Sequence, residues 1–63
     1  MTADEVRQAV REIALQGMIS GHLEALRRFT ATASDPQAFA TEQADKIEKA
    51  FNELVRLYAR EAF

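Results

Sequence analysis

His22 is the only histidine of the chain, and its neighbours decide what chemistry it could support. Ser20 is the nearest candidate nucleophile, but side chains two positions apart on a helix diverge, so Ser20 and His22 cannot act as a nucleophile and its base. The Glu-x-x-His spacing of di-iron helix bundles is missing, because Ile19 stands three residues before His22. Since His22 lies in a row of apolar residues at helical spacing, we interpret it as a packing residue with at most one hydrogen bond.

Other kinds of site are also missing from the sequence. The chain has no cysteine, which removes disulfides and cysteine-based zinc sites. It has no glycine-rich phosphate loop. The acidic residues of the second half mostly have basic neighbours at helical spacing and are typical of a solvated face: Glu42, Asp45, Glu48 and Glu53. The sequence therefore predicts no catalytic residue, no metal ligand and no cofactor, and we expect a protein that is not an enzyme.

Length and charge narrow the class of protein further. Sixty-three residues form a single small domain, 1–63, whose one core supplies only a few kcal/mol. The net charge is −2 and the sequence pI is about 5.2, which disfavours binding to nucleic acid or anionic lipid. No apolar run approaches the roughly 18 residues of a membrane span, and the first residues do not resemble a signal peptide. We expect a soluble cytoplasmic protein.

The first half of the chain predicts helix, but its apolar residues form two sets that point in different directions. Thr2 and Glu5 form a capping box, so a helix should begin there. One apolar set has helical spacing and predicts a buried face: Val6, Val10, Ile13 and Gly17. A second set points elsewhere: Leu15, Ile19, His22, Leu26, Phe29 and Ala33. Because one straight helix cannot bury both sets against one partner, we predict a kink or break near Gly17–Gly21, with Ser20 as a new cap. The alternative is one continuous helix with another element packed closely over both glycines.

The second half predicts one long helix after a turn. Ser34 or Asp35 can cap a helix that has Pro36 at an early position and extends from about residue 37 to residue 60. Its main apolar stripe has steps of three and four: Ala44, Ile47, Phe51, Leu54, Tyr58 and Ala62. Further apolar residues flank it: Phe39, Ala50, Val55 and Leu57. This face is wide enough to meet more than one helix.

The element lengths predict an all-α helical hairpin. Residues 3–16 and 20–33 would each span about 20 Å, and together they match the roughly 35 to 40 Å of the second helix. A lone hairpin cannot cover so wide a face, so we expect a homodimer with a four-helix arrangement. The alternative is a monomeric three-helix bundle.

These expectations lead to a functional hypothesis. We expect a stoichiometric protein–protein interaction module, an adaptor or an inhibitor of a larger protein, of bacterial or phage type. The predicted core and dimer residues are Ile47, Phe51, Leu54 and Tyr58, and the aromatic and apolar candidates for an unknown protein partner are Phe39, Leu57 and Phe63. Two alternatives remain: a dimeric DNA-binding regulator that uses Arg27 and Arg28, and a structural subunit of a hetero-complex.

Overall fold

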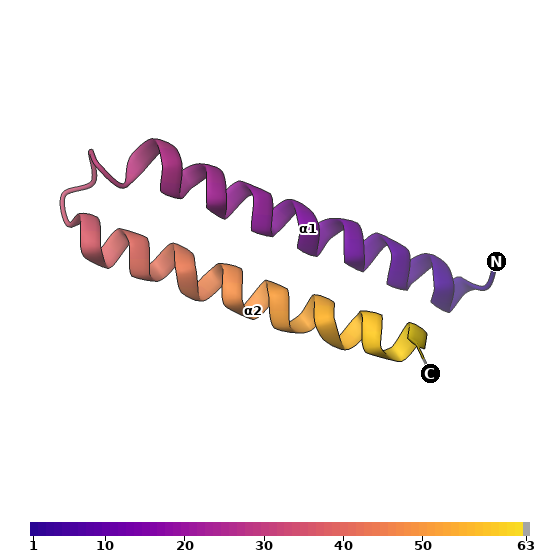
Figure 1. Cartoon of the computed structure of the whole chain (residues 1–63). Helices are drawn as coiled ribbons and strands as arrows, with labels where there is room; N and C mark the ends of the chain where they lie inside the picture. The colour runs from indigo at the N-terminus through magenta and orange to yellow at the C-terminus, as the bar shows by residue number, and fades with distance from the viewer. Residues whose placement is uncertain (63) are drawn as a thin grey trace.

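The computed structural model, which describes residues 1–62, is a hairpin of two antiparallel helices (Figure 1). Helix α1 extends over Ala3–Phe29 and α2 over Pro36–Ala62, and each contains 27 residues. The molecule is long and thin, with extents of 47 × 17 × 12 Å. The prediction of an all-α hairpin is confirmed. The alternative of a three-helix bundle is wrong, because the predicted first arm is a single helix.

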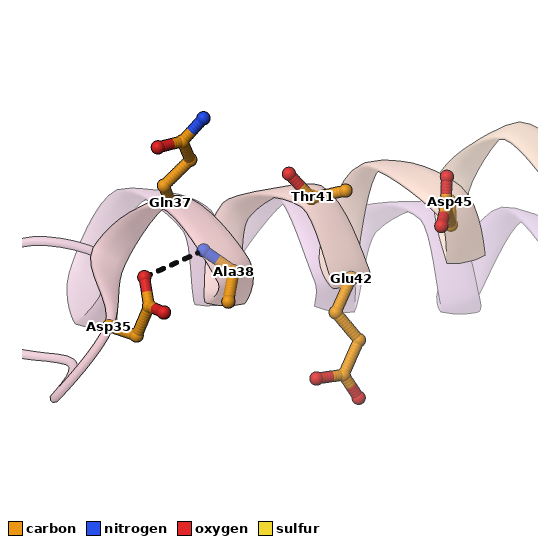
Figure 2. Close-up of a pocket in the computed structure, with 6 residues that line it drawn as sticks. All are labelled: Asp35, Gln37, Ala38, Thr41, Glu42 and Asp45. Carbon is orange, nitrogen blue, oxygen red and sulfur yellow. Dashed lines mark hydrogen bonds between the residues drawn. The ribbon is translucent and has the colours of Figure 1, made fainter.

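Both helices begin with a side-chain cap. At α1 the Glu5 backbone N–H donates to Thr2 Oγ1 at 3.2 Å, as predicted. The Thr2 hydroxyl in turn donates to the Glu5 carboxylate at 3.2 Å. At α2 the cap is Asp35, whose Oδ1 accepts the Ala38 backbone N–H at 3.1 Å (Figure 2). Pro36 then takes the first helical position, where its fixed φ and missing N–H cause no loss.

Of the kink or break predicted near Gly17–Gly21, the break is wrong and the kink is not confirmed. Helix α1 passes through both glycines without interruption, and neither has a positive φ. Ser20 consequently lies inside the helix and caps nothing. Close packing over the glycines is absent too, since a Cβ at either position would have no heavy atom within 4 Å apart from neighbouring backbone. The break was expected so that both apolar sets could be buried. The continuous helix instead buries or half-buries the second set apart from Phe29, and leaves the first set in solvent.

The two helices meet along a seam in which buried and half-buried residues recur at steps of three and four. The seam residues are Gln8, Glu12, Leu15, Ile19, His22 and Leu26 of α1, and Ala40, Gln43, Ile47, Ala50, Leu54 and Leu57 of α2. This is the spacing of the contact positions of a coiled coil. Its centre is small: Leu15 is fully buried, Ala50 and Leu54 are buried beside it, and Ile19 and Leu57 pack against them.

The α1 seam follows the second predicted apolar set from Leu15 to Leu26, whereas the first set points away from α2. In α1 the first set is exposed, with Ile13 at 69%. Ile13 and Leu15 are two positions apart, so at about 100° per residue they lie roughly half a turn apart. In α2, Ile47 and Leu54 of the predicted stripe face α1, but Phe51 and Tyr58 remain exposed. Small Ala50 takes a central position because it lets α1 approach closely enough to bury Leu15 completely.

The continuous helix predicts that Gly17→Ala will stabilise the protein. Alanine favours the helix over glycine by about 1 kcal/mol, and the open space at this position gives the new methyl group nothing to clash with. We expect thermal unfolding to shift upward by several degrees at fixed protein concentration. A glycine that ended the helix in a left-handed conformation would give the opposite result, so destabilisation would contradict the continuous α1.

Candidate interaction surfaces

One flank of the hairpin is charged. The Arg11 guanidinium forms a two-pronged contact with the Glu53 carboxylate across the helices, Nε to Oε1 at 3.0 Å and Nη2 to Oε2 at 2.6 Å. A shallow groove beside this pair is lined by Leu15, Met18, His22, Lys46, Lys49, Ala50 and Glu53. Lys46 also pairs with Glu42 at 3.1 Å. We call the set Arg11, Glu42, Lys46, Lys49 and Glu53 the charged flank.

The Arg11–Glu53 contact shifts both pKa values in the direction expected of an ion pair. The hydrogen bond from Arg11 lowers the pKa of the Glu53 carboxyl group, and the charge of Arg11 acts in the same direction. The hydrogen bond to Glu53 and its negative charge raise the pKa of Arg11. Both side chains are about half exposed, so this is a solvent-screened contact that orients the helices more than it stabilises them.

A polar pair interrupts the apolar seam. His22 Nδ1 and Gln43 Oε1 are 2.6 Å apart, and Gln43 is only 7% exposed. For this contact to be a hydrogen bond, Nδ1 must carry the proton. The two side chains come from different helices and satisfy each other where unpaired polar groups would be costly. His22 thus has the role of a packing residue with one hydrogen bond, in a site that offers neither a nucleophile nor a metal ligand set.

The opposite flank is apolar and uncovered. Phe51, Val55 and Tyr58 lie at helical spacing on α2 and are 43% to 55% exposed. Tyr58 OH accepts a hydrogen bond from Gln16 Nε2 at 2.9 Å, which places Gln16 of α1 on the same side. Leu23, seven residues after Gln16, and Ala44, seven before Phe51, are exposed and extend this surface along both helices. We call Leu23, Ala44, Phe51, Val55 and Tyr58 the apolar flank.

A third surface lies on the back of α1, turned away from α2. It consists of Val6, Val10 and Ile13, which are all exposed and share one face at steps of four and three. We call these three residues the α1 ridge. Gly17 continues its spacing. The ridge is apolar, but it belongs to a single helix.

The predicted partner and core residues are divided among these surfaces. Ile47 and Leu54 lie in the seam, whereas Phe51 and Tyr58 face outward. Of the proposed partner residues, Leu57 packs against the core and Phe39 is half-buried, so neither offers a free anchor. Phe63 lies outside the described residues.

The arginines proposed for DNA contact are engaged with acidic neighbours on α1. Arg27 and Arg28 both contact the carboxylate of Glu24. Arg7 pairs with Asp4 at 3.3 Å, and Arg11 is bound to Glu53. These contacts place an acidic group beside each of the four arginines of α1. The arrangement does not favour a phosphate-binding surface.

A hollow at the start of α2 has an acidic lining without the geometry of a metal site. Its residues are Asp35, Gln37, Ala38, Thr41, Glu42 and Asp45, and Figure 2 shows their side chains pointing in different directions along the helix. Among residues 1–62 no group of three or more acidic or histidine side chains could hold a metal ion. Neither described helix is long and apolar enough to cross a membrane.

Sequence reasoning placed His22 in an apolar set but missed the other polar members of the seam, Gln8, Glu12 and Gln43. Residues seven apart recur on each side, as Gln8, Leu15 and His22 on α1 and as Gln43, Ala50 and Leu57 on α2. A search for large apolar residues alone passes over these repeats. A heptad search that accepted glutamine, histidine and alanine would have found both faces.

The His22–Gln43 contact predicts energetic coupling between the two residues. His22→Leu or Gln43→Leu alone leaves the other polar group buried without its partner, whereas the double substitution removes both. We expect a coupling free energy of about 0.5–3 kcal/mol in urea unfolding of the four proteins at equal concentration. Additive effects would contradict the hydrogen bond.

The Arg11–Glu53 pair predicts a specific loss of stability in acid. Because the pKa of Glu53 is lowered in the folded state, its contribution is present above the unfolded-state pKa and is lost as pH falls through the lower folded-state value. Glu53→Gln should therefore lower the melting temperature at pH 7 and reduce its further fall on going to pH 3. Glu48→Gln is the control, since it removes an α2 carboxylate that Arg11 does not bind. Equal pH profiles for the two variants would contradict the prediction.

Comparison with known proteins identifies no relative of this chain. Searches of protein-family models, of curated proteins and of solved structures found no match. The function must therefore be argued from the three surfaces of the hairpin.

Proposed function

We propose that this chain is a non-enzymatic protein–protein interaction module that forms a homodimer and acts stoichiometrically, as an adaptor or an inhibitor of a larger protein. The observation that carries the proposal is the amount of apolar surface that the hairpin leaves uncovered. Ten large apolar side chains are exposed among the described residues, and seven of them lie on the apolar flank and the α1 ridge. Exposed apolar surface of this kind is typical of protein interaction sites.

The solvent-accessible surface area of the chain supports the proposal that a second copy packs against it. The hairpin exposes 4924 Å², whereas a compact monomer of 7.1 kDa is expected to expose about 4,100 Å². The excess of about 800 Å² equals the area that each partner contributes to an interface of standard size. A dimer of hairpins would thus bring the exposed area per chain down to that of an ordinary small protein.

The small core supports the same proposal. Only three hydrophobic residues, Leu15, Ala50 and Leu54, are buried among those described. Most of the stability of a protein helix comes from packing of its apolar face, and two helices with so short a core bury little. Covering the exposed residues with a second hairpin would add the apolar burial that one chain does not supply.

The three surfaces also suggest how a dimer could still bind another protein. The apolar flank and the α1 ridge point in different directions, so one can be covered by a second copy while the other remains open to a partner. This supports an adaptor or an inhibitor. The paired arginines weaken the DNA-binding alternative, which gains no supporting observation.

The proposal predicts a solution mass of about twice 7.1 kDa. Sedimentation equilibrium from low micromolar to low millimolar concentration should show a monomer–dimer equilibrium that favours the dimer, with helical circular dichroism throughout. A folded monomer over the whole range would contradict the homodimer. An unfolded monomer that becomes helical only with another protein would support the alternative of a hetero-complex subunit.

A further inference from the structure

We infer that the second copy packs on the apolar flank, so that two hairpins face each other through Leu23, Ala44, Phe51, Val55 and Tyr58 and form a four-helix bundle. This inference rests on the proposed homodimer and names its surface. The α1 ridge and the charged flank are the two other long faces that a copy could cover. The contacts of each face decide among them.

The charged flank is the least suitable of the three. A copy packed there would have to remove water from the Arg11–Glu53 pair and from the Lys46–Glu42 pair. Removing water from paired charges carries a desolvation cost that their mutual attraction often does not restore. The apolar flank carries no ion pair between the helices. Its interhelix contact is the neutral hydrogen bond between Gln16 and Tyr58.

That hydrogen bond also lowers the free-energy cost of burying the apolar flank, because it gives the Tyr58 hydroxyl a polar partner. A tyrosine hydroxyl needs a polar partner when it is removed from water. Tyr58 already has one in Gln16, on the neighbouring helix of the same chain, at 2.9 Å. A second copy could therefore cover the ring of Tyr58 without leaving its hydroxyl unpaired.

The apolar flank is wider than the α1 ridge. It draws residues from both helices, which lie side by side along the full hairpin (Figure 1). Two such surfaces placed face to face make a second layer in which each helix meets more than one neighbour, as in a four-helix bundle. The α1 ridge belongs to one helix, so two ridges could meet only along a single line of contact.

The order of side chains along the apolar flank allows it to pair with itself. The contacts of Gln8 with the Leu57 carbonyl group and of His22 with Gln43 set the antiparallel register. In that register Leu23 lies almost level with Ala44, so a large side chain and a small one share one level. A two-fold axis along the hairpin would place α1 of one copy over α2 of the other and set Leu23 of one copy against Ala44 of the other. Such alternation is what close packing requires.

Two matched substitutions test the inference in the intact chain. Phe51→Glu places a charge on the apolar flank, and Ile13→Glu makes the same kind of change on the α1 ridge, at residues that are 55% and 69% exposed in the hairpin. We expect Phe51→Glu to raise the dimer dissociation constant by about 100-fold or more, because the symmetric interface receives the charge twice. Ile13→Glu should change it by less than about threefold, and Phe51→Leu should retain the dimer. Sedimentation equilibrium gives all four constants, including that of the wild type.

Circular dichroism at several protein concentrations separates weakened association from failure to fold. If Phe51→Glu loses helix, the lost signal should return as concentration rises, and Val55→Lys provides a second variant on the same flank. If Ile13→Glu dissociates the dimer while Phe51→Glu and Val55→Lys do not, the inference is overturned. The homodimer interface would then lie on the α1 ridge. Equal effects on both faces, or helix loss that concentration does not reverse, would also overturn it. A wild-type monomer would refute the homodimer itself.

Discussion

The burial of Leu15 against Ala50 and Leu54 is the contact on which the rest of the hairpin depends. It fixes the distance between the helices, because an alanine at the centre of α2 lets α1 approach closely. It also fixes the rotation of each helix about its own axis. Once Leu15 points at α2, Ile13 must point away, and the α1 ridge becomes a surface feature. The same constraint sends Phe51 and Tyr58 to the apolar flank.

Polar contacts then make this arrangement specific. The His22–Gln43 pair near the loop end and the Arg11–Glu53 pair toward the other end join residues that meet only in one antiparallel register. Each contributes little stability by itself, because one replaces bonds to water and the other is half exposed. Their value is that a shifted register would break both. A seam with so few apolar contacts needs such constraints to select one pairing.

Charge is distributed unevenly over the faces of the hairpin. Ion pairs between and along the helices occupy one flank, a largely apolar surface occupies the other, and a single-helix ridge lies behind α1. A protein that worked alone would gain little from exposing so many apolar side chains. The proposed homodimer explains the apolar flank, and a protein partner on the α1 ridge would explain the third surface. Neither role requires chemistry at His22, which is occupied by its contact with Gln43.

The sequence by itself determined that the chain is helical and where the two helices begin. The signals are local: the Thr2 cap, the polar turn, and the Asp35–Pro36 start that follows it. Hydrogen bonds between residues close in sequence are enough to form these helix starts. The tertiary structure decided which face of each helix is buried. Apolar residues occur on opposite sides of α1 and over a wide arc of α2, so several rotations would bury similar areas and spacing alone could not choose among them. The choice came from contacts between distant residues: a small alanine that admits Leu15, and polar pairs that fit only one register.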